Sequence, residues 1–580
     1  MSLAKRVAQE MNEKLGGVVG YSVRFEEMSS KETMIKYLTD GMLLRELLSD
    51  PNLSRYTTII LDEAHERTLR TDILFGMIKR IQAGRPVNQP LKIIIMSATL
   101  DPKRFESFFK NVGVYRVPGR MFPVKLLYTV EPVQDYIDTA ILTIFQIHTD
   151  PKNAQGGDIL VFLTGQEEIE AVQKTLEEFG PQCPSGSPKM IVCPIFASLP
   201  SHQQMSVFQP TPQGCRKIIL ATNIAETSIT ISGIKFVIDS GFVKMRQYNS
   251  RTGMEALLIQ PVSKSSARQR TGRAGRETSG DCYRLYPEEA FLKLEDETIP
   301  EILRTNLSNV ILIMKACGIE NVLKFDYLDA PGLDCLQRGL EELLALGALD
   351  SDGNLSEMGK LMAECPLIPQ LSRVLLESVK LGCSEEVLSI ISMLSSDTIF
   401  FSSGEDREKT SAAKKTFQHR SGDHLTLLSV FNTFMAHRSD PKWCASNYID
   451  SRSMKHVCDV RQQLVDFCNK SKLKITSCNG AIEKILQSFV AGYFLQSAIR
   501  LGDGTFKTIS SKQHVHIHPS SVIFGTRPDC ILFHEITLTS KCYLRGVSVV
   551  ESAWIQEQTF KTTHPQPKVK DSKGVKSISF

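Results

Sequence analysis

The sequence of 580 residues lacks the features of a membrane protein or a disulfide-rich secreted protein. No run reaches the roughly 18 uninterrupted apolar residues that a membrane-spanning helix needs. The first residues, MSLAKRVAQEMNEK, intersperse charges among apolar residues and contain no apolar core of a secretory signal. The 14 cysteines include no C-x-x-C pair, which argues against a zinc ribbon and against a disulfide framework. These absences favour an intracellular protein.

Net charge is also lacking over most of the chain. The formal net charge is +4, and the segment from Lys561 to Phe580, with five lysines and one aspartate, contributes +4 by itself. The remaining chain is therefore neutral overall, so any binding of nucleic acid has to use local basic grooves and backbone contacts. Residues 564–580 (HPQPKVKDSKGVKSISF) are predicted to form a flexible basic tail.

The chain is too long for a single hydrophobic core, and its patterning changes twice. Up to about residue 290, short apolar runs predict buried parallel strands covered by helices, at 56–61, 91–96, 158–163, 217–221 and 235–238. The proline-bearing segment 118–132 predicts a boundary between two such sheets. Leucines at helical spacing predict helices from about residue 300, and short alternating segments predict a small β domain after about residue 491.

Polar clusters follow the first two predicted strands. Asp62, Glu63, Ala64 and His65 come directly after strand 56–61. A carboxylate pair there suits phosphoryl transfer, in which one carboxylate holds Mg²⁺ and the other polarises the attacking water. A solvated acidic turn is the alternative interpretation. The tripeptide 97–99 (SAT) ends the next strand, and its hydroxyls could relay the state of a bound nucleotide; a simple turn or helix cap is the alternative.

The segment 269–276 (QRTGRAGR) is the strongest chemical signal in the chain. Its arginines, Arg270, Arg273 and Arg276, recur every third residue, which predicts that a helical turn places them along one face. The two glycines let the backbone approach a ligand closely. Such an array suits the charge that develops on a transferred phosphate, whereas a solvated basic helix would need no glycines.

Together, these segments resemble the motifs of superfamily 2 helicases of the DEAH-box family, in the same order along the chain. The similar segments are 2–7 (motif Ia), 39–41 (Ib), 62–65 (II), 97–99 (III), 162–168 (IV), 221–228 (V) and 269–276 (VI). The resemblance continues through 300–307, 422–428, 516–521 and 539–543 and covers about residues 1 to 556. Within the family, the amino-acid sequence of these segments is most similar to that of the nucleolar DEAH helicase that is linked to ribosomal RNA synthesis.

The resemblance implies an α/β fold with two RecA-like parallel-sheet domains, the first one incomplete, followed by three smaller domains. The implied domains are 1–125 (RecA-like domain 1, partial), 126–299 (RecA-like domain 2), 300–370 (winged helix), 371–490 (helical bundle), 491–558 (OB-like β-barrel) and 559–580 (basic tail). The implied activity is ATP-dependent RNA unwinding or ribonucleoprotein remodelling, in the 3′-to-5′ direction. The implied cofactors are ATP, or any NTP, and Mg²⁺.

The resemblance also implies roles for individual residues. Asp62 would hold Mg²⁺, with Glu63 beside it as the catalytic base and His65 completing the motif. The phosphates of the nucleotide would contact Gln269, Arg273 and Arg276. The base would stack between Arg6 and Phe208, and Asp239 would lie on the ribose side. Ser97 and Thr99 would sense the nucleotide. The RNA backbone would contact Arg24, Thr39, Gly165, Thr222 and Asn223. The implied partners are single-stranded or duplex RNA and a protein activator. The resemblance implies a monomer that does not contact a membrane. The implied location is the nucleus, including the nucleolus, and the cytoplasm is the alternative.

One expected motif is missing from the sequence. A P-loop, G-x-x-x-x-G-K-[ST], does not occur, and the only Gly-Lys pair, Gly359 and Lys360, lies in a predicted helix. Three hypotheses stay open: an active helicase with a truncated sequence, an RNA-binding or scaffold protein without hydrolysis, and a motor for DNA or mixed duplexes. In either of the first two cases the first sheet is expected to lack a strand and to expose apolar surface. His514, His516 and His518 could hold zinc, but a wet strand face is the favoured interpretation.

Overall fold

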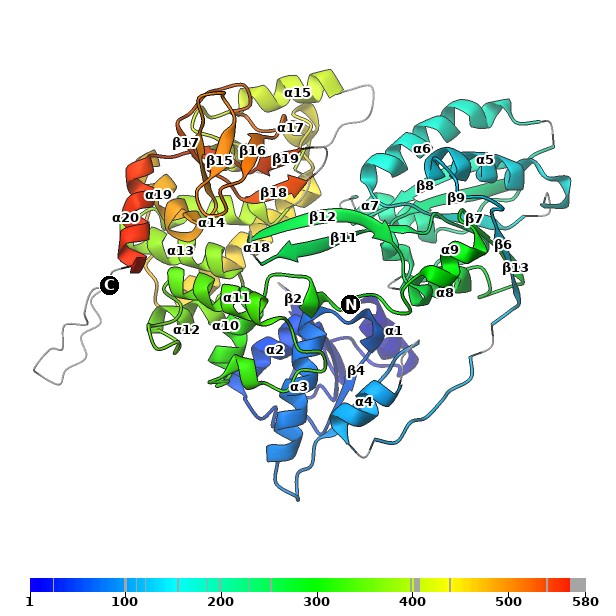
Figure 1. The fold of residues 1–580 in the computed structure, drawn as a ribbon, viewed down its shortest axis with the longest axis horizontal. Helices are drawn as coiled ribbons and strands as arrows, with labels where there is room; N and C mark the ends of the chain where they lie inside the picture. The colour runs from blue at the N-terminus through cyan, green and yellow to red at the C-terminus, as the bar shows by residue number, and fades with distance from the viewer. Residues whose placement is uncertain are drawn as a thin grey trace, which may run out of the picture. The chain divides into compact units, whose positions relative to one another are not determined.

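The computed structural model describes residues 1–23, 26–98, 102–110, 112–119, 121–153, 156–184, 186–197, 199, 201–227, 229–250, 253–396, 399–400, 407–437, 440–538 and 541–563. The chain divides into two compact units (Figure 1). Unit 1 comprises Met1–Lys110, Tyr248–Ala256 and Pro300–Phe580, and unit 2 comprises Asn111–Gln247 and Leu257–Ile299. Each unit encloses its own hydrophobic core.

Unit 2 is built on a six-stranded parallel sheet with the order β6-β13-β10-β7-β9-β8. Its strands are β6 (Val124–Tyr128), β7 (Asp158–Phe162), β8 (Lys189–Ile195), β9 (Cys215–Ala221), β10 (Ile234–Asp239) and β13 (Gly280–Arg284). Its helices are α5 (Tyr136–Thr149), α6 (Gln166–Phe179), α7 (Ser201–Gln204), α8 (Lys264–Gly272) and α9 (Glu288–Lys293), with short turns η2 (Pro151–Asn153), η3 (Gly180–Gln182), η4 (Met205–Phe208) and η5 (Asn223–Ala225). The strands β11 (Phe242–Asn249) and β12 (Met254–Pro261) form a separate ribbon, whose tip belongs to unit 1.

Both faces of this sheet are buried, and this explains the continuous apolar runs of its central strands. In β7, Ile159 and Val161 pack with α5 and α6 on one face, whereas Leu160 and Phe162 pack on the other face against Val207, Ala225 and Ala274. Figure 1 shows α5 and α6 on the same side of the sheet. The strands predicted at 158–163, 217–221 and 235–238 are therefore confirmed as buried parallel strands.

The segment 118–132 was predicted to separate two sheets, but in the structure part of it belongs to the second sheet. It contains β6, whose residues pair in parallel with β13, so this strand is the edge of the second sheet. Unit 2 accordingly begins at Asn111, before the prolines. A solitary edge strand has pairing on one side only, and its apolar pattern is too short to show which sheet it joins.

The N-terminal part of unit 1 contains two small sheets and four helices. One sheet has the order β2-β1-β3, and the other pairs β4 with β5 in parallel. The elements are α1 (Ser2–Glu10), β1 (Val19–Val23), β2 (Glu26–Met28), β3 (Ile35–Leu38), α2 (Asp40–Ser49), β4 (Thr58–Leu61), η1 (Ala64–Glu66), α3 (Leu69–Gly84), β5 (Lys92–Ile95) and α4 (Pro102–Phe109).

The predicted strands at 56–61 and 91–96 are present as β4 and β5, but the prediction that both their faces are buried is wrong. Ile59 and Leu61 are buried in the core of unit 1, whereas the side chains of Ile60 and Ile94 are 55% and 40% exposed. Among the described residues, β4 pairs only with β5, and the opposite face of the pair carries little cover.

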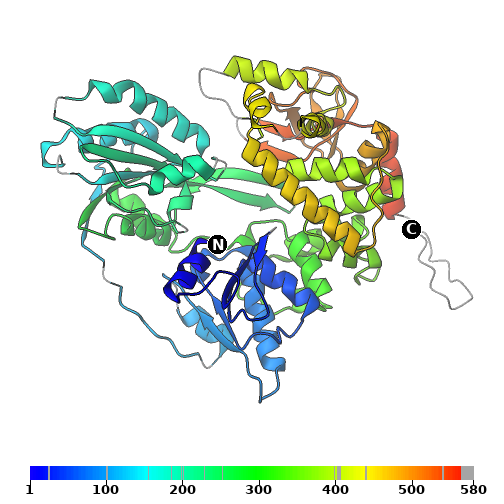
Figure 2. The same cartoon turned by 180° about the vertical axis from the view of Figure 1, so that it is seen from behind.

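In the described residues between 301 and 493, the C-terminal part of unit 1 consists mainly of helices, as the leucine spacing predicts. Its helices are η6 (Glu301–Leu303), α10 (Ser308–Ala316), η7 (Val322–Lys324), α11 (Leu333–Ala345), α12 (Glu357–Glu364), α13 (Pro369–Leu381), α14 (Ser384–Leu394), α15 (Arg407–Thr416), α16 (Asp423–Ala436), α17 (Pro441–Ser446), α18 (Ser451–Lys470) and α19 (Ile482–Tyr493). Figure 2 shows α18, in gold, along its length. Within the described ranges, no helix combines the length and the apolar character of a membrane span.

A seven-stranded sheet follows, with the order β18-β19-β16-β15-β14-β17-β20. Its strands are β14 (Ser497–Arg500), β15 (Phe506–Thr508), β16 (His514–Ile517), β17 (Cys530–Leu532), β18 (Glu535–Leu538), β19 (Cys542–Arg545) and β20 (Ser548–Val549). Helix α20 (Ser552–Thr563) then extends beyond residue 558, the predicted end of the OB-like domain. The predicted tail, 564–580, lies outside the described residues.

The histidines of β16 alternate with buried residues. Val515 and Ile517 are buried, whereas His514 is exposed and His516 is half-buried. No group of three or more His, Cys, Asp or Glu side chains arranged for a metal occurs in the part of the chain that the structure describes. The favoured interpretation, a wet strand face, fits this arrangement.

Asp423, at the start of α16, joins the helical part of unit 1 to the C-terminal sheet. Its carboxylate accepts hydrogen bonds from the Val547 amide (2.7 Å), the Val522 amide (2.9 Å) and the Ser521 hydroxyl (2.9 Å). The preceding residue, Gly422, has φ +125°, and a Cβ atom there would lie 2.4 Å from the Val547 carbonyl oxygen. The segment from Gly422 therefore docks against the sheet through a close backbone approach that only glycine permits.

We predict that Asp423→Asn lowers the free energy of unfolding of unit 1 by about 2 kcal/mol, because an amide group cannot accept all three hydrogen bonds and leaves buried amides unpaired. Urea denaturation followed by tryptophan fluorescence measures this, since both tryptophans, Trp443 and Trp554, lie in unit 1. Asp459→Asn, at an exposed position of α18, is the matched control and should leave the midpoint unchanged. Equal effects of the two substitutions would contradict the role of Asp423.

Candidate active site and nucleic-acid interface

The predicted carboxylate pair lies in a sharp turn at the end of β4. The Glu63 amide donates to Asp62 Oδ1 at 2.8 Å, and Glu63 adopts a left-handed conformation with φ +49°. Both carboxylates are exposed. The next amide, of Ala64, donates to the Met96 carbonyl at 3.0 Å, so the end of β5 holds this turn in place. Two exposed carboxylates at a strand end fit a Mg²⁺ ion that keeps most of its ligands as water and phosphate oxygens.

His65 connects this turn to the SAT segment. Its side chain is only 7% exposed, and its Nδ1 atom lies 3.4 Å from Glu63 Oε2 and 3.3 Å from the Ser97 hydroxyl. The structure therefore brings together Asp62, Glu63, His65 and Ser97. Thr99 lies outside the described residues. The imidazole ring of His65 therefore contacts both Glu63 and Ser97, and it connects the carboxylate turn to the SAT segment.

Arg67 is a further member of this region that the sequence did not reveal. Its guanidinium donates to both oxygens of Asp72, at 2.7 and 3.0 Å, and also contacts Asp329. The Arg67 carbonyl accepts from the Glu301 amide at 3.1 Å. The segment after motif II is thus tied to residues more than 200 positions later, and no local pattern announces such a long-range pair.

The arginines of segment 269–276 do not share one helical face, so this prediction is wrong. Helix α8 ends at Gly272, which leaves Arg273 at its C-cap and Arg276 beyond it. Arg270 is fully buried, Arg273 is nearly buried, and Arg276 is exposed. The glycines end the helix, and the chain then turns.

Arg270 serves as an internal support. It donates to Asp239 Oδ1 (2.7 Å), to Glu226 Oε2 (3.0 Å) and to the Phe242 carbonyl (3.2 Å). Burial lowers its pKa, but the two carboxylates raise the pKa more, so it stays above its usual value. The guanidinium carbon also lies 4.8 Å from the centre of the Phe162 ring.

The surroundings of Asp239 argue against its predicted place beside a ribose. The residue is fully buried, and its second oxygen accepts from the Tyr286 hydroxyl at 2.9 Å. Burial, followed by the charge of Asp239, raises the pKa of Tyr286 well above its usual value, so this hydroxyl stays a donor. In this structure both oxygens of Asp239 are engaged by protein groups.

The other predicted phosphate contacts lie nearer the surface. Arg276 donates to the Thr230 hydroxyl at 2.8 Å, and Arg273 donates to the Ile229 carbonyl at 2.8 Å and to the Glu226 carbonyl. Gln269 is half-buried on α8. The contacts of these three residues with phosphates stay predictions.

Three of the predicted RNA contacts gather at one edge of unit 2. Gly165 follows β7 and is the N-cap of α6, while Thr222 and Asn223 follow β9. Because β7 and β9 are parallel neighbours, their carboxyl ends meet at the same edge of the sheet. Asn223 is exposed and Thr222 is half-buried. Exposed backbone and short polar side chains at such an edge suit contacts with a sugar-phosphate backbone.

Lys244, which the sequence did not single out, lies beside Gly165. Its Nζ atom is 3.9 Å from the position that a Cβ atom would take on Gly165. Lys244 follows the end of β10 in the ribbon strand β11, and no short motif marks it. A cation at this edge complements a phosphate that contacts Gly165.

The remaining predicted residues lie apart from these clusters. Arg6 is 72% exposed and pairs with Glu10 at 2.6 Å in unit 1, whereas Phe208 is 43% exposed in unit 2, so their stacking on one base stays a prediction. Thr39 is exposed at the N-cap of α2, where its side chain makes no capping hydrogen bond. Arg24 lies outside the described residues.

Four family models match parts of this architecture. The Helicase conserved C-terminal domain matches residues 139–278, and the winged-helix Helicase associated domain (HA2) matches 339–367. The ratchet-like Helicase associated domain (HA2) matches 368–427, and the Oligonucleotide/oligosaccharide-binding (OB)-fold matches 485–560.

Two relatives at 46% identity decide the family. The human ATP-dependent RNA helicase DHX33 is 46% identical over 562 residues, which are 96% of this chain and 79% of the relative. The chain belongs to the DEAH-box RNA helicase family. The mouse DHX33 is also 46% identical over 562 residues, with 96% and 80% of the two chains covered. The Pre-mRNA-splicing factor ATP-dependent RNA helicase prp22 of Schizosaccharomyces pombe is 45% identical over 584 residues, with 100% of this chain and 49% of the relative covered.

Membership of the DEAH-box family confirms the predicted fold class. The chain contains a parallel-sheet α/β part, a winged helix, a helical helicase-associated part and an OB fold, in the predicted order. The family models match segments of both units, between residues 139 and 560.

We predict that Arg270→Gln destabilises unit 2 of this DEAH-box chain by about 3 kcal/mol or more, because it leaves the buried Asp239 and Glu226 carboxylates without their cation. Hydrogen exchange of peptides from β7 and β10 measures the loss. Arg276→Gln, at an exposed position in the same segment, should leave this exchange unchanged. Equal protection in the two variants would show that Arg270 does not support the sheet.

Proposed function

We propose that this protein is an ATP-dependent RNA helicase that moves 3′ to 5′ along one strand. The observation that carries the proposal is the common edge of the unit 2 sheet, where Gly165, Thr222 and Asn223 follow neighbouring parallel strands. The names of the three relatives, each an ATP-dependent RNA helicase, support it.

The edge of unit 2 would grip the RNA backbone without reading its sequence. Gly165 offers backbone, Thr222 and Asn223 offer short polar side chains, and Lys244 adds a positive charge beside Gly165. Contacts of this kind position a strand and carry no base information, which suits a protein that moves along many sequences. In unit 1, Thr39 and Arg24 would contact the same kind of backbone.

The motif II turn would carry the hydrolysis. Bound Mg²⁺ would neutralise phosphate charge, and Asp62 would hold it. Glu63 would accept a proton from the attacking water, and His65 would keep the Glu63 carboxylate oriented through their 3.4 Å contact while touching Ser97. Gln269, Arg273 and Arg276 would contact the phosphates of ATP or another NTP, and Arg6 and Phe208 would stack on its base.

The second candidate, an RNA-binding or scaffold protein without hydrolysis, is not favoured by the relatives, each of which is named an ATP-dependent RNA helicase. Residues 1–580 contain no P-loop. The single Gly-Lys pair lies inside α12, where Lys360 pairs with Glu357 at 2.7 Å. A P-loop needs its glycine-rich backbone to wrap around phosphates, which a helix interior cannot do.

Phosphate release from ATP by the purified 580-residue chain, with and without single-stranded RNA, separates the two candidates. A rate that RNA raises and that Glu63→Gln abolishes supports the ATP-dependent helicase and shows phosphate binding without a P-loop. A rate equal to that of Glu63→Gln, with RNA still bound, supports the second candidate. Replacing the RNA by single-stranded DNA tests the third hypothesis, because backbone contacts distinguish the two sugars poorly.

The proposal includes a nuclear location, with the nucleolus as the finer assignment and the cytoplasm as the alternative. It also includes a monomeric state and a protein activator as an additional partner. The name of one relative, a pre-mRNA-splicing factor, supports the nuclear assignment. A fluorescent fusion imaged beside a nucleolar marker tests it.

We predict that Asn223→Ala weakens binding of single-stranded RNA roughly tenfold, to a similar extent for every base sequence, because the lost contact is to the backbone. Fluorescence anisotropy with homopolymeric RNAs measures this. Asn88→Ala, at an exposed turn of unit 1, is the matched control and should bind as the unmodified chain does. A loss confined to one base sequence would contradict backbone recognition.

A further inference from the structure

A small cavity in unit 1 carries an excess of positive charge. Its volume is about 80 Å³, and by the same measure a single water needs roughly 10–15 Å³, so the cavity has room for a group of several heavy atoms. It is lined by segments of α2, α3, α10 and the region 362–368. Among the described residues that line it, two are arginines, Arg45 and Arg70, and none is an aspartate or a glutamate.

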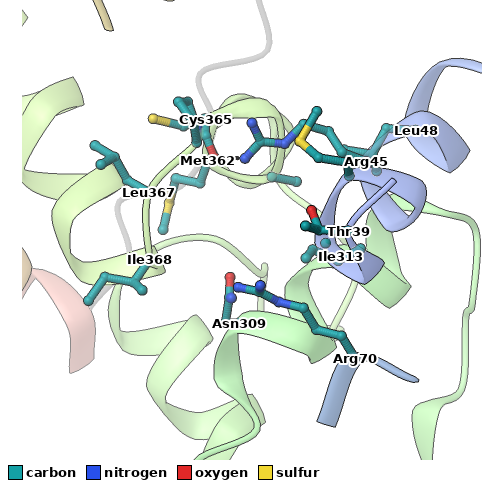
Figure 3. Close-up of a pocket in the computed structure, with 14 residues that line it drawn as sticks. Thr39, Arg45, Leu48, Arg70, Asn309, Ile313, Met362, Cys365, Leu367 and Ile368 are labelled. Carbon is teal, nitrogen blue, oxygen red and sulfur yellow. Dashed lines mark hydrogen bonds between the residues drawn. The ribbon is translucent and has the colours of Figure 1, made fainter. Parts of the chain in front are cut away.

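The two guanidinium groups extend into this cavity from α2 and α3 (Figure 3). Burial lowers the pKa of Arg45, and the nearby charge of Arg70 lowers it further. Arg45 donates one hydrogen bond, to the Cys365 carbonyl at 3.4 Å. Within the described part of the chain, Arg70 has no hydrogen-bond or ion-pair partner. Two like charges that repel each other without a carboxylate between them favour a bound anion.

The backbone around Arg70 leaves room for its guanidinium. A Cβ atom on Gly41 would lie 2.9 Å from the Arg70 Nη1 atom, so the absence of a side chain at Gly41 lets the arginine lie against the first turn of α2. Thr39, the N-cap of α2, lines the same cavity, and its side chain makes no capping hydrogen bond. Asn309, in the first turn of α10, adds a polar side chain to the lining (Figure 3).

We propose that this cavity binds one phosphate of the RNA backbone, held by the guanidinium groups of Arg70 and Arg45 and by the Thr39 hydroxyl. The proposal rests on the proposed RNA binding of this chain, in which Thr39 contacts the backbone. Arginine matches a phosphate with two parallel N–H donors, and a hydroxyl supplies a third. The cavity thus adds Arg45 and Arg70 to the residues that would hold the strand.

The first test measures the affinity of Arg70→Gln for a short single-stranded oligouridylate across a range of salt concentrations. Loss of one phosphate contact should weaken binding roughly tenfold and reduce the slope of log affinity against log salt by about 0.7. Arg80→Gln, at an exposed position of the same helix, is the matched control and should change neither quantity. Because Arg70 and Arg80 are both exposed, neither substitution should change the stability of the chain. Equal melting temperatures of the two variants and the unmodified chain would verify that both variants fold.

The second test locates the phosphate by replacing each linkage of the oligonucleotide, in turn, with a neutral methylphosphonate. In the unmodified chain, one linkage should weaken binding about as much as Arg70→Gln does, and in Arg70→Gln the same linkage should have no further effect. The proposal would be overturned if each neutral linkage changed the affinity of the unmodified chain and that of Arg70→Gln by the same factor. Stabilisation of the unmodified chain by pyrophosphate, absent in Arg70→Gln and without any linkage effect, would also overturn it and assign the cavity to a free phosphate compound.

The two proposals fail differently in these measurements. If Asn223→Ala weakens RNA binding while Arg70→Gln binds as Arg80→Gln does, only the phosphate site is wrong. If the unmodified chain does not bind RNA at all, the proposed function fails, and the phosphate site fails with it.

Discussion

The buried charge of Arg270 is the constraint on which unit 2 depends. A fully enclosed guanidinium has to be neutralised and hydrogen-bonded, because an unpaired buried charge is strongly destabilising. Glu226, Asp239 and the Phe242 carbonyl supply these contacts from three segments of the chain. The same contact therefore fixes the turn after β9, which carries Thr222 and Asn223, relative to the segment that carries Arg273. The residues proposed for RNA and those proposed for phosphates share one internal support.

Unit 1 uses the same device at two joints between distant segments. Arg67 connects the motif II segment to Asp329 and to the backbone at Glu301, and Asp423 connects the helical part to the C-terminal sheet. Arg67 is buried and Asp423 is half-buried, and each makes hydrogen bonds to partners far away in the sequence. Such groups are costly to leave unpaired, so each favours one arrangement of the segments that it joins.

Local patterns predicted the elements well and the environments of single residues less well. The run 158–163 was predicted as a doubly buried strand, and the buried clusters on both of its faces confirm it. The similar run 56–61 was predicted in the same way, yet Ile60 is exposed, because burial depends on which segments cover the sheet. The spacing of Arg270, Arg273 and Arg276 indicated one helical face, but Gly272 ends the helix within the triplet and sends each arginine into a different environment.

The sequence by itself determined the strands, the order of the motifs, the family that they indicate and the change to helical and then β structure near residues 300 and 491. These features follow from local composition and periodicity, which act over a few neighbouring residues. Only the tertiary structure decided that Asp239 supports Arg270, that His65 reaches Ser97, that Lys244 lies beside Gly165, and that Arg45 and Arg70 line one cavity. These contacts join residues from separate elements, and their geometry arises from packing, which no local pattern encodes.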